Sequence, residues 1–217
     1  MNARSPNKRQ FLDRPRILDV AISFADAHGV EDMTMRKIAG ELNCGAMSLY
    51  NHVANKEELL TDMLDAVVGK IDTPDIEGDW KIAMRASAQS ANRVLLNHHW
   101  AVGEWNLRMP GPNRTRYMES ILAALTQAKL NDAIIYRGYH AITMHIVGFS
   151  QQQIGYQKML GPNFHEIAEG FLSELGGNYP YLAYHVRAHL DEPEECDEFL
   201  FVLDLILDGL ERAAQCS

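Results

Sequence analysis

Residues 34–60 read TMRKIAGELNCGAMSLYNHVANKEELL, and this stretch decides how the N-terminal part of the chain folds. Thr34 is a good helix N-cap, and Met35, Ile38 and Ala39 after it have the spacing of one helical face. This spacing predicts a short helix, which ends where the letters NCG begin, because asparagine and glycine both tolerate left-handed backbone geometry. A tight turn therefore separates this helix from the next one.

The next helix is predicted over residues 46–53, and it has two faces. Leu49 and Val53 lie four residues apart, so both can anchor the helix to a core. The opposite face carries side chains able to meet DNA: Met47, Ser48, Tyr50, Asn51 and His52. Short helices joined by such a turn are typical of the helix-turn-helix arrangement, in which the last helix enters the major groove of duplex DNA.

A helix is also predicted before this stretch. Ile17, Val20, Ala21 and Phe24 lie at positions i, i+3, i+4 and i+7, which places them on one face, and Gly29 suits the helix end. With the two helices above, this one completes a three-helix DNA-binding domain.

A fourth helix is predicted over residues 56–71, because Asn55 with Glu58 gives a capping-box start. Residues 72–75 end it, and we place a domain boundary there. The expected organisation of the chain is a basic flexible arm (1–13), a helix-turn-helix domain (14–55), a connecting helix (56–73) and an effector-binding and dimerisation domain (74–217).

The rest of the chain also has helical spacing, interrupted by groups of glycine, proline and asparagine. The expected helices cover residues 78–98, 100–108, 112–128, 131–156, 164–175 and 195–213, with a further helical piece within 179–190. No alternating run bounded by hairpin turns indicates a strand. The predicted fold class is all-α, with a small DNA-binding domain and a larger helical ligand-binding and dimerisation domain.

The net charge of -9 is unevenly divided, since all of the acidic excess lies beyond residue 60. The first sixteen residues are basic, and this charge suits contact with phosphate, although a solvated tail would look the same. The cations concerned are Arg4, Lys8, Arg9, Arg14 and Arg16.

Targeting and cysteine signals are weak. No apolar run is long enough to span a membrane, and the N-terminus lacks the apolar stretch of a signal peptide, so we expect a cytoplasmic protein with no membrane partner. The three cysteines, Cys44, Cys196 and Cys216, are too widely spaced for a disulfide framework or a zinc cluster. An oxidation switch at Cys44 stays open.

The motifs T-x-R-x-I-A (34–39), S-L-Y-x-H-V (48–53) and N-K-E-E-L-L (55–60) occur in order, and together they resemble the signature of the tetracycline-repressor (TetR) family over residues 16–64. The closing run F-x-x-x-L-D-x-I-L-D-G-L-E, residues 199–211, is similar to the C-terminal domain of the tetracycline-repressor branch. The resemblance implies a dimeric, ligand-responsive repressor that binds double-stranded operator DNA. It also implies that ligand moves the fourth helix and so changes the spacing of the two DNA readers.

Carried over position by position, the resemblance implies a set of DNA-contacting residues. Arg36 would reach a base edge or phosphate, Lys56 would hold a phosphate, and Thr34 would both cap its helix and donate to phosphate. The complete set is Thr34, Arg36, Lys37, Ala46, Met47, Ser48, Tyr50, Asn51, His52 and Lys56. The chain departs from the family pattern at Asn43, which stands where glycine is usual, and at the small or apolar residues 45–47. Base reading is therefore expected to use methyl contacts and DNA shape, which leaves the operator sequence unpredicted.

The second domain is expected to hold the effector and the dimer contact. Helices that are apolar over more than one face predict a homodimer interface at Ile142, Ile146, Phe199, Leu203, Ile206 and Leu210. Aromatic, methionine and histidine side chains predict a pocket for a small apolar or aromatic effector, at Met84, His98, Trp100, Trp105, Met118, Tyr139 and Met144. The histidine spacing is poor for a metal site, so neither metal nor cofactor is expected.

Two alternatives remain open at this point. A helical enzyme is disfavoured because the chain has no nucleophile elbow, no phosphate-cradling glycine loop and no zinc-hydrolase motif. A ligand-blind DNA-binding protein or an activator would have the same N-terminal pattern.

Overall fold

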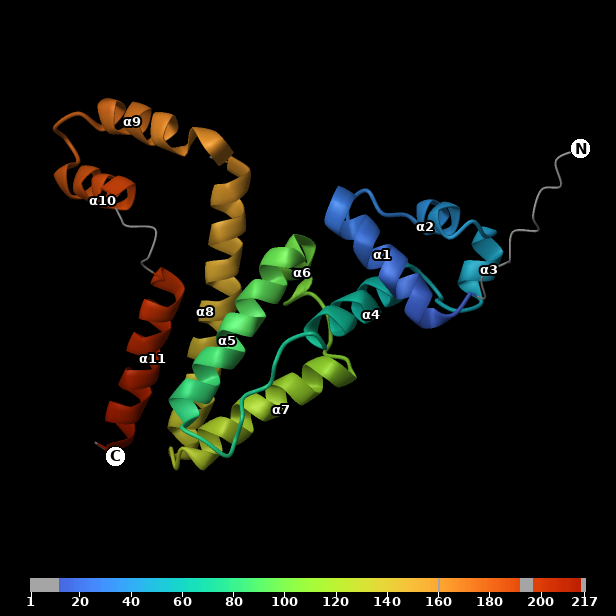
Figure 1. Ribbon diagram of the computed structural model, residues 1–217, viewed down its shortest axis with the longest axis horizontal. Coiled ribbons are helices and arrows are strands. Elements are labelled where there is room, and N and C mark those ends of the chain that lie inside the picture. Colours follow the sequence, from blue (N-terminus) through green and yellow to red (C-terminus); the bar gives the residue numbers. More distant parts are fainter. Residues whose placement is uncertain (1–11, 160, 192–196, 216–217) are drawn as a thin grey trace, which may run out of the picture. The chain divides into compact units, whose positions relative to one another are not determined.

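A computed structural model of the protein describes residues 12–159, 161–191 and 197–215, and these ranges are helical without a strand (Figure 1). The helices are α1 (Arg14–His28), α2 (Met35–Glu41), α3 (Ala46–Tyr50), α4 (Lys56–Val68), α5 (Trp80–Asn97), α6 (His99–Glu104), α7 (Pro112–Gln127), α8 (Asp132–Met159), α9 (Phe164–Leu175), α10 (Pro180–Asp191) and α11 (Glu198–Gln215), with a 3-10 turn at Gly161–Asn163. The all-α prediction is therefore confirmed. Three helices end three or four residues earlier than predicted: α3 at Tyr50, α4 at Val68 and α6 at Glu104.

The chain divides into two compact units. The N-terminal unit contains Met1–Ile71 and Asn97–Met118, and the C-terminal unit contains Asp72–Leu96 and Glu119–Ser217. The N-terminal unit is thus built from two separate pieces of sequence. The helical spacing of apolar residues in the sequence does not predict that Asn97–Met118 returns to the N-terminal unit.

The core of the N-terminal unit is formed where α1 packs against α2 and α4. Ile17 and Ala21 of α1 are fully buried, as their spacing predicted, and so are Leu59, Met63 and Val67 of α4. Burial of each such leucine, methionine or isoleucine side chain contributes about 1.5–3 kcal/mol. This core supports the short helices α2 and α3, which pack against each other and, through α2, against α1.

The returning segment is fastened to the N-terminal unit by the carboxylate of Asp26 in α1. The Asp26 Oδ1 atom accepts a hydrogen bond from the indole Nε1 of Trp100 at 2.8 Å and lies 2.9 Å from Nδ1 of His98. Lys70 Nζ lies 3.1 Å from the other ring nitrogen of His98. Because an ammonium group can only donate, His98 Nε2 accepts from Lys70, and the ring proton sits on Nδ1, where it is donated to Asp26.

Asp65 of α4 fastens the second part of the returning segment. Its two carboxylate oxygens accept the backbone N–H groups of Asn113 and Arg114, at 3.1 and 2.9 Å, in the first turn of α7. An acidic side chain is favourable there because the N–H groups of a first helical turn have no partner within the helix. Gly111 lies directly against this carboxylate, since a Cβ at that position would lie 2.5 Å from Asp65 Cγ.

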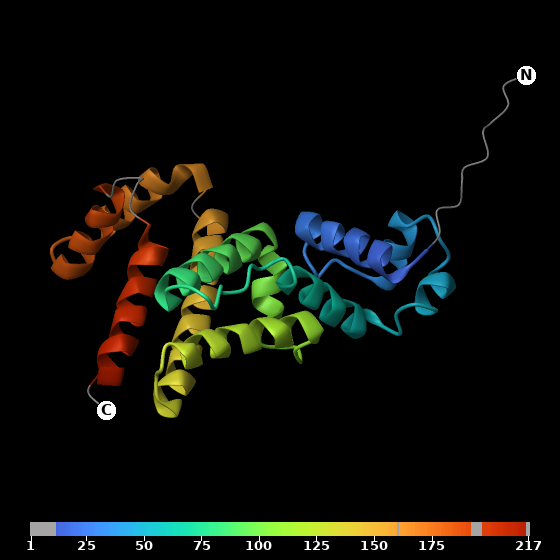
Figure 2. The same cartoon turned by 60° about the horizontal axis from the view of Figure 1, so that its bottom comes forward.

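The C-terminal unit is organised around α8, which runs beside α11 in both ribbon views (Figures 1 and 2). The imidazole of His145 in α8 stacks on Phe199 of α11 with ring centroids 4.7 Å apart. Lys81 of α5 forms ion pairs with Asp208 and Glu211 of α11, which fixes α5 to the same helix. Within the described ranges, no helix is both long enough and apolar enough to cross a membrane.

Candidate nucleic-acid interface

The turn between α2 and α3 has the left-handed residue predicted at Asn43, while Gly45 is extended, with φ −74° and ψ 145°. Asn43 adopts a φ of 51°, in the left-handed region. The backbone N–H of Cys44 donates to the carbonyl of Ala39 at 3.0 Å, which closes the end of α2. The Cys44 thiol is free and the residue is half-buried, while Cys196 and Cys216 lie outside the described residues.

The α3 helix has one buried and one exposed face. Leu49 is 0% exposed and Val53, just beyond the helix, is 1% exposed, so both anchor it as predicted. Met47 is 76% exposed and Tyr50 is 44% exposed. The other predicted DNA-contacting residues of this segment are exposed or half-buried: Ala46, Ser48, Asn51 and His52. An exposed methionine and tyrosine side by side form a surface that could contact base edges.

The predicted DNA-contacting residues of α2 have different surroundings. Thr34 caps the helix, since its Oγ1 accepts from the N–H of Lys37 at 3.2 Å. The Lys37 ammonium donates to the carbonyl of Asp32 at 2.8 Å and lies 5.9 Å from the centre of the Phe24 ring. Arg36 is exposed and has no hydrogen bond or ion pair within the described part of the chain. Arg36 is therefore the cation of this helix that is available to a phosphate or a base.

The start of α4 has the predicted cap. Asn55 Oδ1 accepts the N–H of Glu58 at 2.8 Å, and the Glu58 carboxylate accepts the N–H of Ala54 at 2.8 Å. Lys56, predicted to hold a phosphate, is half-buried and donates from Nζ to the carbonyl of Val30 at 2.7 Å. The Lys56 ammonium thus joins α4 to the loop before α2, and its role at a phosphate stays a prediction.

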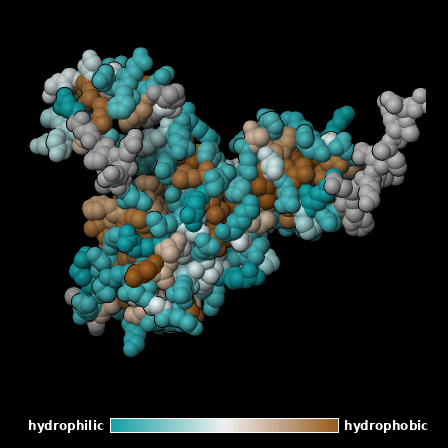
Figure 3. Space-filling view, viewed as in Figure 1, coloured by the Kyte–Doolittle hydropathy of each residue, from teal (hydrophilic) through white to brown (hydrophobic). Residues whose placement is uncertain are grey.

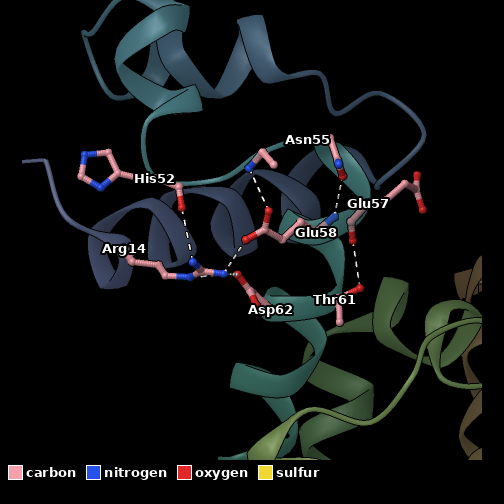
Figure 4. A network of polar contacts seen from close by, with 8 residues as sticks. Arg14, His52, Asn55, Glu57, Glu58, Thr61 and Asp62 are labelled. Atoms are coloured by element: carbon pink, nitrogen blue, oxygen red, sulfur yellow. Dashed lines mark hydrogen bonds and ion pairs between the residues drawn. The ribbon is translucent and has the colours of Figure 1, made fainter.

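Arg14 of α1 joins the end of the α3 segment to α4 (Figure 4). Its guanidinium donates to the carbonyl of His52 at 3.3 Å, to Glu58 Oε1 at 2.8 Å and, from Nε, to Asp62 Oδ2 at 3.0 Å. Arg14 Nη2 donates to the same Asp62 oxygen, so one carboxylate oxygen accepts from two guanidinium nitrogens. Sequence analysis counted Arg14 among the basic residues at the start of the chain whose charge suits contact with phosphate, and in the structure its guanidinium is paired with two carboxylates of its own unit.

The pKa directions agree with this geometry. The hydrogen bond to Asp62 is the largest effect on Arg14 and raises its pKa against a smaller opposing effect of burial, and Glu58 adds to the rise. The pKa of Glu58 is lowered, first by the backbone N–H of Ala54 and then by Arg14. Both groups are therefore held in their charged forms.

The predicted effector residues fall into both units. His98, Trp100, Trp105 and Met118 belong to the N-terminal unit, and Met84, Tyr139 and Met144 belong to the C-terminal unit. In the first set, the ring N–H groups of His98 and Trp100 already bond to Asp26, and the Arg114 guanidinium lies 4.8 Å from the centre of the Trp105 ring.

In the second set, Met84 is buried at 1% exposure and Met144 is 71% exposed. A single pocket lined by all seven residues stays a prediction. Among the residues with a described placement, no group of three histidine, cysteine or acidic side chains is arranged to hold a metal ion.

Most of the predicted dimer residues pack inside a single chain. Ile142, Ile146, Phe199 and Leu203 are all at most 5% exposed within the C-terminal unit. Ile206 and Leu210 are half-buried, and Leu210 packs against Gly138 of α8. The large apolar residues of α11 that are exposed are others: Phe201, Val202 and Leu205. Figure 3 shows apolar side chains at the surface over this helix.

The comparisons with known proteins agree with these features. Residues 17–63 match the profile described as bacterial regulatory proteins, tetR family, and residues 73–214, more than half of the chain, match the tetracyclin repressor-like C-terminal domain. The chain belongs to the TetR family. This TetR-family protein is a transcriptional regulator with a helix-turn-helix DNA-binding domain, and not an enzyme.

Relatives along the whole length of this TetR-family chain support the same assignment. It is 33% identical, over 96% of this chain and 80% of the relative, to the HTH-type transcriptional repressor DrrR1 of Streptomyces coeruleorubidus. It is 30% identical to an HTH-type transcriptional regulator of Saccharopolyspora erythraea, over 84% of this chain and 81% of that protein. Among solved structures, the TetR-family protein ActR of Streptomyces coelicolor in complex with actinorhodin matches with a TM-score of 0.81 and 27% identity, over 94% of this chain and 99% of that one.

Proposed function

We propose that this protein is a repressor that binds a palindromic operator as a homodimer in the cytoplasm and is released from it by a small apolar or aromatic effector. The observation that carries the proposal is the division of α3, whose Leu49 is buried while Met47 and Tyr50 face solvent. An exposed apolar face on a helix of the reading domain has a partner in the major groove, where the thymine methyl group offers an apolar contact. The relatives named repressor or regulator support the same function.

The homodimer is supported by the exposed side of α11. Phe201 and Leu205, at 63% and 54% exposure, are apolar and lie four residues apart on one helical face. A second copy of the chain would cover them, as a two-fold interface uses the same patch from both subunits. Two reading domains could then meet successive major grooves of a palindrome.

The effector site is proposed within residues 74–217, the expected effector-binding and dimerisation domain, with residues 1–13 as a basic arm, 14–55 as the reader and 56–73 as the connection. Support comes from a relative, since ActR of Streptomyces coelicolor has been solved with actinorhodin and with (S)-DNPA. The chain crosses between its units after Ile71, Leu96 and Met118, so a change in the C-terminal unit has three covalent routes to the reader. A coupling of about 1–3 kcal/mol, typical between two such sites, would weaken operator binding about 5- to 150-fold.

The test is operator binding by the full chain, measured by fluorescence anisotropy on fragments from the region upstream of its own gene. Tyr50→Ala should weaken binding roughly tenfold to a hundredfold, the cost of one lost base contact. Tyr181→Ala is the matched control, because Tyr181 is 89% exposed on α10, outside the reader, and should bind as the parent does. Binding by the parent that Tyr50→Ala leaves intact refutes the assignment of α3, and binding that no apolar or aromatic compound releases refutes the sensor.

A further inference from the structure

The α3 segment cannot hold its own orientation. It has five residues, its N-cap is Gly45 and it has no side-chain cap. Helices this short are unstable in isolation, because nucleation costs more than so few hydrogen bonds return. The angle at which Met47 and Tyr50 meet a partner is therefore set by the buried Leu49 together with the contacts at the two ends of the segment.

At the C-terminal end, these contacts converge on one guanidinium. Arg14 binds the carbonyl of His52, just after α3, while the Glu58 carboxylate joins Arg14 to the N–H of Ala54 in the following loop. Asp62, one turn further along α4, holds the guanidinium from the other side. The planar fork of arginine allows these simultaneous contacts, and the ammonium of lysine does not have this shape.

We propose that Arg14 is a positioning residue for DNA reading, which fixes the α3 segment against α1 and α4 through Glu58 and Asp62 and makes no phosphate contact itself. This inference rests on the proposed function, because it requires that α3 reads DNA. It gives a role to the acidic side chains of Glu58 and Asp62, which lie in a domain whose proposed partner, DNA, is itself negatively charged. Near DNA, such charges cost binding energy through repulsion, and here they are needed to hold Arg14.

The inference and simple electrostatics predict opposite effects of Glu58→Gln on operator affinity. Loss of a negative charge close to DNA should tighten binding if only charge matters. If Glu58 positions α3 through Arg14, Glu58→Gln should weaken specific binding roughly tenfold, as the loss of a charged hydrogen bond predicts. Glu41→Gln is the matched control, because Glu41 is an exposed acid of α2 without this network, and it should bind as tightly as the parent or slightly more tightly.

The salt dependence separates positioning from phosphate contact. A lost phosphate contact lowers the slope of log K against log salt by about 0.9. Arg14→Gln and Arg14→Lys should both weaken specific binding roughly tenfold with the parent's slope, because each loses the fork. Arg36→Gln serves as the comparison for an exposed cation with a free guanidinium.

The experiment measures affinity of the full chain for the operator fragment and for random-sequence DNA of equal length, at several salt concentrations. We expect Arg14→Lys, Glu58→Gln and Asp62→Asn to lose operator affinity and specificity while circular dichroism shows parental helix content. If Glu58→Gln or Asp62→Asn loses helix content, the comparison rests on Arg14→Lys, which keeps the positive charge at position 14. Any one of three results overturns the inference alone. They are parental operator affinity in Arg14→Lys, tighter binding by Glu58→Gln, and a salt-dependence slope lowered by about 0.9 in Arg14→Gln. A parent protein that binds no fragment refutes the proposed function as well.

Discussion

Substitution of Asp26 by alanine should destabilise the N-terminal unit by about 4 kcal/mol, because it leaves two largely buried N–H donors without their acceptor. The Asp26 carboxylate accepts from Trp100, which is 7% exposed, and from His98, whose side chain is 12% exposed. Water has little access to either ring N–H, so each donor left without an acceptor costs about 1–3 kcal/mol. We take roughly the middle of that range for each donor.

Asp19→Ala is the matched control, because Asp19 is an exposed aspartate of the same helix. It reports the small gain in helix propensity that alanine brings, a few tenths of a kcal/mol. The assay is urea-induced unfolding followed by tryptophan fluorescence, since two of the three tryptophans, Trp100 and Trp105, lie in the N-terminal unit. Free energies of unfolding for Asp26→Ala and Asp19→Ala that agree within about 0.5 kcal/mol would contradict the reasoning.

Three further predictions concern other sites. Leu49→Ala should cost about 2–5 kcal/mol in a thermal or urea melt and abolish operator binding, because Leu49 is fully buried, whereas Leu49→Met should cost less than about 1.5 kcal/mol. Burial lowers the pKa of His145 below 6.5, against a smaller rise caused by the Phe199 carbonyl. The unfolded chain therefore binds the proton more readily than the folded one, and stability should fall as the pH drops below 6.5. His145→Gln should remove this part of the pH dependence in urea melts. Phe201→Asp should halve the mass measured by light scattering, whereas Tyr181→Asp, at a still more exposed aromatic of α10, should leave the mass unchanged. A mass unaffected by Phe201→Asp argues against the α11 interface.

The elements and the two faces of the reading helix could be predicted from sequence because both depend on local rules. Periodicity placed Leu49 and Val53 in the core, and both are buried. The positive φ of Asn43 followed from the turn chemistry of its residue type. In each case the information lies within a few residues of the feature it predicts.

The polar network could not be predicted for the opposite reason. Arg14 and Asp62 are 48 residues apart, and an arginine at a helix start looks the same in sequence whether it meets phosphate or a carboxylate. Asp26 and His98 are likewise joined only by the fold. The predicted dimer residues are apolar positions of α8 and α11, and hydrophobicity alone does not separate burial in the chain's own core from burial against a partner. Exposed neighbours such as Phe201 are identified only when the helix is seen packed.

The N-terminal unit is assembled from two stretches of chain, and this limits how the regulator can be taken apart. A fragment cut at Ile71 would lack Trp100, His98 and the first turn of α7, leaving Asp26 and Asp65 as carboxylates with no donors. Grafting a new DNA specificity onto another sensor, or the reverse, therefore requires exchange of both stretches together. Recombination at the apparent linker would produce chimaeras with mismatched halves, so substitutions within α3 are the simpler route to altered operator preference.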